Sequence, residues 1–123
     1  MEAKPKILFV DDDSSLKRIL EKILQDEGYN VDVASDGNTA KEKLLLHDYD
    51  VAILDNNLPG MNAIDVLKEI NHPDVTEKVI MITAVNEDEL AREGKKLGVR
   101  EFLAKPFDMD KVISSIQRIH SLK

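Results

Sequence analysis

Apolar residues alternate between two patterns along this chain. Short runs in which nearly every residue is apolar, such as 7–10 and 51–54, are typical of strands that are buried on both faces. Between these runs, apolar residues recur every three or four positions, which places them on one face of a helix. The first set with that spacing comprises Leu16, Ile19, Leu20, Ile23 and Leu24. Strict alternation of the two patterns predicts a parallel sheet whose strands are joined by helical crossovers.

The alternation predicts five strands and five helices. The expected strands are residues 7–10, 29–34, 51–54, 79–82 and 101–104. Residues 29–34 alternate between apolar and polar, so we place this strand nearer the sheet edge. Ser14 and Ser15 are cap candidates for the first expected helix, and the other helices should begin at Asp36, before Ile64, at Asn86 and near Met109. Gly28 and Gly98 should end the first and fourth helices, and His72-Pro73 should follow the end of the third.

The fourth expected helix has the weakest pattern. Its apolar stripe is thin, and Gly94 lies inside it at a cost of roughly 1 kcal/mol relative to alanine. We therefore expect this helix to be the least firmly held of the five.

Composition narrows the possible classes of protein. The chain has 123 residues, 42% hydrophobic and 33% charged, so we expect one domain spanning residues 1–123. It has no cysteine, which excludes disulfides, thiolate metal sites and cysteine nucleophiles. The net charge of −7 argues against direct nucleic-acid binding. No apolar run approaches the ~20 residues of a membrane span, and the N-terminus lacks an apolar secretory segment, so we expect a cytoplasmic location.

Polar residues follow four of the expected strands directly. Asp11 and Asp12 follow the first strand, and Asp55 follows the third. Thr83 follows the fourth strand and Lys105 the fifth. The carboxyl ends of parallel strands share one edge of the sheet, and ligands bind there at the point where the strand order reverses. In the order 2-1-3-4-5 that point lies between the first and third strands, so the three aspartates should converge.

These residue types point to phosphoryl chemistry. Three carboxylates in one crevice suit a divalent cation, because Mg²⁺ prefers oxygen ligands and often shares them with waters and a phosphoryl oxygen. A hydroxyl and an ammonium group across the site suit an anion beside the metal. Asp55 is central and is a candidate nucleophile that would form an aspartyl-phosphate. Each element alone has a plainer interpretation as a solvated helix start or a turn, so the hypothesis depends on their occurring together.

Four stretches together resemble the receiver domain of bacterial response regulators: "ILFVDDD", "AILDNNLPGMN", "VIMITA" and "LGVREFLAKPFD". The resemblance covers the whole chain. It implies a flavodoxin-like α/β fold, in which a doubly wound, five-stranded parallel sheet of order 2-1-3-4-5 is flanked by five helices. The ending "AKPFDMDKV" also resembles the stand-alone receivers of sporulation-type phosphorelays, although a receiver taken from a longer regulator would look the same.

The resemblance implies a role for each residue at the sheet edge. Asp55 would be the phosphoacceptor. Mg²⁺, or Mn²⁺ in its place, would be bound by Asp11, Asp12, Asp55 and the backbone carbonyl of Asn57. The phosphoryl group would be held by Thr83, Lys105 and the backbone N–H groups of Asn56 and Ala84. Phe102 would occupy the aromatic switch position and move inward together with Thr83. The Lys105-Pro106 bond would be cis.

The resemblance also implies partners and leaves alternatives. A regulatory receiver takes its phosphoryl group from a phosphohistidine of a sensor histidine kinase or a histidine phosphotransfer domain, and it signals to a downstream output protein or domain. One alternative is a haloacid-dehalogenase-type phosphatase, because Asp11 and Asp13 have D-x-D spacing after the first strand. Another is an interaction module that never carries phosphate. The complete set of Asp11, Asp12, Asp55, Thr83 and Lys105 argues against the second alternative.

Overall fold

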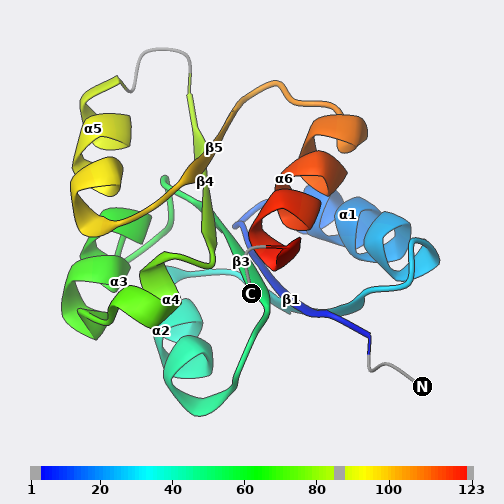
Figure 1. Cartoon of the computed structure of the whole chain (residues 1–123), viewed down its shortest axis with the longest axis horizontal. Coiled ribbons are helices and arrows are strands. Elements are labelled where there is room, and N and C mark those ends of the chain that lie inside the picture. The colour runs from blue at the N-terminus through cyan, green and yellow to red at the C-terminus, as the bar shows by residue number, and fades with distance from the viewer. Residues whose placement is uncertain (1–3, 85–87, 122–123) are drawn as a thin grey trace.

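The computed structural model describes residues 4–84 and 88–121. In that part of the chain, five parallel strands form one sheet in the order β2-β1-β3-β4-β5, and helices lie on both sides of it (Figure 1). The strands are β1 (Lys6–Val10), β2 (Asn30–Ala34), β3 (Val51–Asp55), β4 (Val79–Thr83) and β5 (Glu101–Ala104). The helices are α1 (Ser14–Asp26), α2 (Gly37–Leu46), α3 (Ala63–Ile70), α4 (Pro73–Thr76), α5 (Asp88–Leu97) and α6 (Met109–Ser121). The expected fold class and strand order are confirmed.

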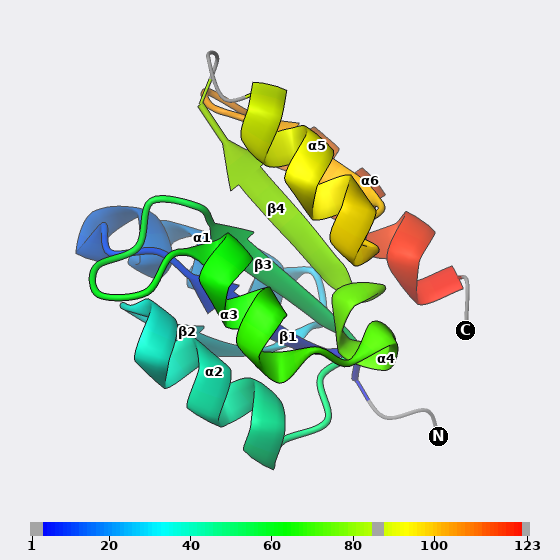
Figure 2. The same cartoon turned by 90° about the vertical axis from the view of Figure 1, so that its left-hand side faces the viewer.

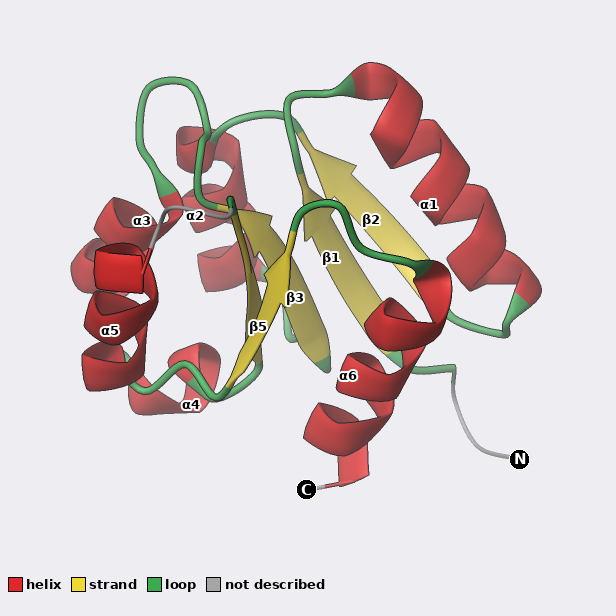
Figure 3. Ribbon diagram, turned by 90° about the horizontal axis from the view of Figure 1, so that it is seen from above, coloured by secondary structure: helices red, strands yellow, loops and turns green. Residues whose placement is uncertain are grey.

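The sheet separates two apolar layers. Helices α1 and α6 cover one face, and α2, α3 and α5 cover the other (Figure 3). Successive residues of a strand point to opposite faces, so Ile7 and Phe9 of β1 contact the first layer while Leu8 and Val10 contact the second. Because the inner strands are buried on both faces, polar side chains are confined to their ends. None of the helices in the described part of the chain is long and apolar enough to cross a membrane.

Helix α1 is capped by Asp13, so the expectation that Ser14 or Ser15 forms the cap was wrong. The Asp13 carboxylate accepts hydrogen bonds from the backbone N–H groups of Ser15 at 3.0 Å and Leu16 at 3.1 Å. A carboxylate at this position satisfies two otherwise unpaired donors and also complements the positive end of the helix dipole. The third aspartate of the "DDD" run is therefore a structural residue.

Helix α4 was not predicted, so the structure has six helices in its described residues where five were expected. Helix α3 ends at Ile70, before His72-Pro73 as predicted. The chain then begins a new turn at Pro73, whose restricted φ suits the first position of a helix. The Thr76 hydroxyl donates a hydrogen bond to the carbonyl of His72 at 2.9 Å. A helix of four residues is too short to show an apolar stripe in the sequence.

Helix α5 corresponds to the fourth expected helix. Its expected cap, Asn86, lies outside the described residues. Gly94 is buried at the contact between α5 and the sheet. A Cβ atom added at Gly94 would lie 3.1 Å from Cε1 of Phe102 and 3.2 Å from Cε of Met81. The glycine therefore lets α5 approach β4 and β5 closely, which offsets its poor helix propensity.

Candidate functional site at the carboxyl edge of the sheet

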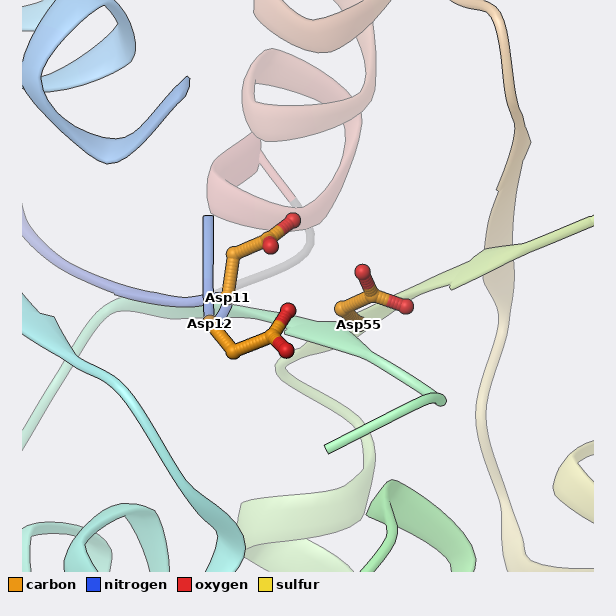
Figure 4. A group of neighbouring side chains, drawn as sticks. All are labelled: Asp11, Asp12 and Asp55. Carbon is orange, nitrogen blue, oxygen red and sulfur yellow. The ribbon is translucent and has the colours of Figure 1, made fainter. Parts of the chain in front are cut away.

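Three carboxylates meet where the strand order reverses. Asp11 and Asp12 follow β1, and Asp55 is the last residue of the neighbouring β3 (Figure 4). The two strands pair with Val10 opposite Leu54, so the residues that follow lie level with one another. One carboxylate oxygen from each aspartate lies within 4.8 Å of the other two. The sequence-based expectation that these three residues converge is therefore met by the geometry.

Backbone N–H groups orient two of the carboxylates. The N–H of Asp13 donates to Oδ1 of Asp11 at 2.9 Å, and the N–H of Asn57 donates to Oδ1 of Asp55 at 3.1 Å. In both cases the donor lies two residues after the aspartate, which is the Asx-turn arrangement. These local bonds hold each carboxylate in one orientation and leave its Oδ2 atom for contacts across the site.

Lys105 reaches both buried aspartates from β5. Its backbone N–H donates to the carbonyl of Thr83 at 2.9 Å, which fixes the start of the loop after the strand. Its Nζ lies 2.6 Å from Oδ2 of Asp55 and 3.5 Å from Oδ2 of Asp11. The Lys105 side chain is 41% exposed, whereas the side chain of Asp55 is 6% exposed. The ammonium group therefore stands between the buried carboxylates and solvent. The following peptide bond, Lys105-Pro106, is cis.

Burial and the nearby charge of opposite sign have opposing effects on the pKa values of Asp11 and Lys105. Burial raises the pKa of Asp11, and the nearby Asp55 charge adds to the rise. The N–H of Asp13 and the charge of Lys105 oppose it. Burial by itself would lower the pKa of Lys105, but the hydrogen bond that Lys105 donates to Asp55 and the charges of Asp55 and Asp11 outweigh burial, so that pKa is raised. The lysine thus stays charged and partly neutralises the aspartates.

The donor set fits a divalent cation that prefers oxygen ligands. Mg²⁺ takes octahedral ligands at about 2.1 Å, so oxygens on opposite sides of the ion are about 4.2 Å apart. The three aspartate oxygens span at most 4.8 Å, so small side-chain rotations would bring them to that geometry. Asp12 is exposed while Asp11 and Asp55 are buried, so water ligands have access on the Asp12 side. The acidic cluster is therefore a candidate cation site.

The other expected residues, Thr83, Ala84 and Phe102, lie on β4 and β5 or directly after β4. Thr83 ends β4 and is 8% exposed, and it pairs with Ala104 of β5. Phe102 of β5 pairs with Met81 of β4, and Met81 lies two residues before Thr83 on the same strand. Because alternate residues of a strand share a face, Thr83, Met81 and Phe102 all lie on the side of the sheet that α5 covers. Ala84 follows Thr83 and is exposed.

The two residues after Asp55 use their backbone N–H groups differently. The N–H of Asn56 donates to the carbonyl of Ile82 at 3.1 Å, which continues the pairing of β3 with β4. The N–H of Asn57 faces the Asp55 carboxylate. Sequence reasoning assigned only the carbonyl of Asn57 to the site and missed its N–H. The D-x-N spacing, in which an aspartate precedes a turn by two residues, was the available signal.

A family model described as the response regulator receiver domain matches residues 7–117. The chain belongs to this family. The receiver is 34% identical over 118 residues to the sporulation initiation phosphotransferase F of Bacillus subtilis, a match that covers 96% of this chain and 95% of that protein. It is 36% identical over 114 residues to the response regulator ArlR of Staphylococcus aureus, which covers 93% of this chain and 52% of ArlR. The receiver thus spans about half the length of ArlR.

A solved structure with the same fold is the receiver domain of the sensor histidine kinase PA1611 from Pseudomonas aeruginosa, which has a magnesium ion in its active-site cleft. It is 25% identical to this receiver, with a TM-score of 0.83, and the match covers 97% of this chain and 99% of that chain.

The family identifies the class of function. This receiver is a phosphoryl-accepting module of two-component signalling, with a phosphorelay protein among its relatives. The phosphatase alternative gains no support from the family model or from these relatives. The structure gives a physical reason, because Asp13, the second aspartate of the D-x-D spacing, points its carboxylate at the N–H groups of α1.

Proposed function

We propose that Asp55 accepts the phosphoryl group in a reaction that depends on Mg²⁺, with Mn²⁺ as a substitute. The observation that carries the proposal is the position of the Asp55 carboxylate, which lies 2.6 Å from Nζ of Lys105 and shares one crevice with Asp11 and Asp12. The magnesium ion in the cleft of the PA1611 receiver supports the choice of metal. Asp11, Asp12, Asp55 and the carbonyl of Asn57 are the proposed ligands.

The proposed reaction transfers a phosphoryl group from a donor to a carboxylate oxygen of Asp55. An oxygen–phosphorus bond forms, the bond between phosphorus and the donor atom breaks, and the leaving group keeps the electron pair. When the donor is a phosphohistidine, the leaving imidazole nitrogen takes up a proton. Bound Mg²⁺ would offset the charge on the phosphoryl oxygens. Lys105 adds a second positive charge once its contact with Asp55 is shared with the incoming group.

We assign the phosphoryl contacts to Lys105, the Thr83 hydroxyl and the backbone N–H of Ala84. The resemblance also assigns the N–H of Asn56, which in this structure donates to Ile82, so it would have to release or share that bond. The N–H of Asn57 already donates to Oδ1 of Asp55 and is a further candidate. A shift of Thr83 toward the phosphoryl group would open space for Phe102, which we propose as the switch.

The proposed partners follow from this chemistry. The donor is a phosphohistidine on a sensor histidine kinase or a histidine phosphotransfer domain, and the phosphorylated surface acts on a downstream output protein or domain. In this scheme the receiver is a regulatory phosphoacceptor in the cytoplasm, where such donors and Mg²⁺ are available. It takes part in its own phosphorylation and does not turn over a separate substrate.

Labelling with a small donor tests the proposal. With Mg²⁺ and acetyl phosphate, the receiver should gain one phosphoryl group on Asp55, detected by mass spectrometry and lost in mild alkali as an acyl phosphate is. Asp55→Asn should not be labelled. Lys105→Ala should be labelled more slowly and respond poorly, because the second positive charge is missing. The matched control is Asp13→Asn, which makes the same chemical change two residues from Asp11 while asparagine keeps the helix cap.

The control should be labelled at the wild-type rate. Label on Asp11 or Asp13 in place of Asp55 would overturn the proposal and restore the phosphatase interpretation.

A further inference from the structure

The loop from Asn56 to Asn62 joins the proposed phosphoacceptor to α3 and is anchored at both ends. At its start, the N–H of Asn57 donates to Asp55. At its end, Oδ1 of Asn62 accepts a hydrogen bond from the N–H of Asp65 at 2.9 Å and caps α3. Figure 2 shows that the first turn of α2 lies against the middle of this loop. The position of the proposed metal ligand Asn57 therefore depends on the contact between the loop and α2.

The contact between α2 and the loop is made by backbone on both sides. The N–H of Gly37 lies 3.5 Å from the carbonyl oxygen of Pro59. A Cβ atom added at Gly37 would lie 1.7 Å from the carbonyl oxygen of Met61 and 2.6 Å from its carbonyl carbon. A Cβ added at Gly60 would lie 3.3 Å from Nδ2 of Asn38. The start of α2 and the loop thus each have a glycine at the point where the other segment comes closest.

Gly37 is required for space and not for its backbone angles. Gly28, Gly60 and Gly98 have positive φ, at +97°, +77° and +108°, but Gly37 does not fall in that region. It is the first residue of α2, where most residue types are accepted. Its role is therefore to let the Met61 carbonyl approach the helix to a distance that no side chain permits.

A side chain at Gly37 would displace the loop more readily than the helix. Helix α2 is fixed by Ala40, which is 0% exposed, and by Leu44, which is 8% exposed. The loop is exposed at Asn57, Pro59 and Gly60, with Leu58 buried between them. To relieve an approach of 1.7 Å, Met61 would have to move by more than an ångström, and the move would spread along the short loop toward Asn57.

We propose that Gly37 is a positioning residue for the phosphorylation site, acting through the loop that carries Asn57. The proposal rests on the proposed function, because it concerns how fast Asp55 accepts phosphate. Gly37 touches neither the metal nor the phosphoryl group. Its backbone sets how close the loop lies to α2, and so where the carbonyl and N–H of Asn57 stand relative to Asp55.

The test is Gly37→Ala, labelled with acetyl phosphate over a range of Mg²⁺ concentrations. The rate should fall by roughly tenfold or more, since a displacement of about 1 Å in a reacting geometry costs up to ~100-fold. The Mg²⁺ dissociation constant, measured by calorimetry without a donor, should rise together with the Mg²⁺ concentration for half-maximal rate, because the Asn57 carbonyl is displaced. A variant that is merely less stable, but still folded by circular dichroism, would keep the wild-type Mg²⁺ dependence.

A matched pair of variants makes the test independent of how well Gly37→Ala folds. Gly60→Ala and Gly28→Ala both place alanine at positive φ and so cost similar strain, but only Gly60 lies in the loop, and a Cβ at Gly28 would meet nothing within 4 Å. Gly60→Ala should change the labelling rate and the Mg²⁺ dependence in the same direction but by a smaller factor, because its Cβ would meet only the Asn38 side chain at 3.3 Å, and Gly28→Ala should change neither.

Two results would overturn the inference. One is a folded Gly37→Ala that is labelled within twofold of the wild-type rate with unchanged Mg²⁺ dependence. The other is equal slowing in Gly60→Ala and Gly28→Ala. Absence of label on the wild-type protein would instead contradict the proposed function itself, so the two failures are distinguishable.

Discussion

Tyr49 joins the segment before β3 to the edge strand β2 through one partly buried hydrogen bond. Its hydroxyl donates to Oδ2 of Asp32 at 2.7 Å, and the residue is 3% exposed. The ammonium of Lys6 lies 5.1 Å from the ring centroid. Burial, together with the Asp32 carboxylate, strongly raises the pKa of Tyr49. Ionisation of this hydroxyl is therefore far less favourable in the folded state than in the unfolded chain.

Tyr49→Phe should lower the free energy of unfolding near neutral pH by about 1 kcal/mol or more, because Asp32 loses its partner. The raised pKa means that the stabilisation is fully present below the unfolded value of about 10 and is lost as pH rises above it. Urea unfolding at a series of pH values should show the gap between wild type and variant shrinking above pH 10. Tyr29 is present in both proteins and cancels. A gap that stays constant into alkaline pH would contradict this account.

Residue identity at the sheet edge was predictable from sequence where strand position decided it. Asp11 follows β1, Asp55 ends β3 and Lys105 follows the edge strand β5, and parallel strands bring residues at their carboxyl ends together whatever the helices do. Asp13 and Gly37 were not assigned their roles, because helix capping and backbone approach depend on local dihedral angles and on segments distant in sequence. Composition and periodicity contain no information on local dihedral angles or on which distant segments come into contact.

At the scale of whole elements, helix α5 has a residue of low helix propensity, Gly94, where it packs on the sheet. Gly94 faces the ring of Phe102, and the ammonium of Lys95 lies 5.9 Å from the centroid of that ring. Replacing a helical glycine by alanine normally stabilises a protein by about 1 kcal/mol. Here the added methyl group would press on the ring, so the gain depends on whether Phe102 can move aside.

A double-mutant cycle can measure whether Gly94→Ala raises or lowers the free energy of unfolding. Gly94→Ala should give little gain, or a loss, in the free energy of unfolding when Phe102 is present. In a Phe102→Ala background the same change should stabilise the protein by up to roughly 1 kcal/mol, because the ring no longer opposes the methyl group and the end of the Met81 side chain, at 3.2 Å, can turn away. Denaturant unfolding of the four proteins gives the coupling. Equal effects of Gly94→Ala in both backgrounds would show that the ring does not limit this contact.

Elements with a recognisable periodic pattern were predictable, including α5 with its thin apolar stripe, but the short helix α4 was not. Helices α1 and α6 and the five strands were found where periodicity placed them. Helix α4 was missed because a proline start and a threonine side-chain bond define it in four residues. The strand order was implied by the resemblance, since apolar runs alone do not say which strands are neighbours.

For the molecule as a whole, the acidic edge concentrates part of the net charge of −7 in one place. Lys105 compensates two of the three carboxylates, and Asp12 has no ion pair in the described part of the chain within 4.0 Å. Mg²⁺ should therefore raise the melting temperature. Ligand linkage gives about 2.7 kcal/mol at 100 times the dissociation constant.

Thermal unfolding with and without millimolar Mg²⁺ measures this, with NaCl at matched ionic strength as the control for screening. Asp12→Asn should lose most of the Mg²⁺ effect, because it removes a charged ligand while keeping the side-chain shape. An unchanged melting temperature for the wild-type protein in Mg²⁺ would contradict a cation site at this edge.

The parallel arrangement has a practical consequence for how this receiver can be handled. Every strand points its carboxyl end at the phosphorylation site, so β1 enters the sheet from the far edge, and α6 runs back toward that same edge after β5 (Figures 1 and 2). A tether attached at Lys4 or at the last turn of α6 would thus lie on the side opposite Asp55. A surface coated with the protein through either end would display its acidic crevice outward, open to any donor passing in solution.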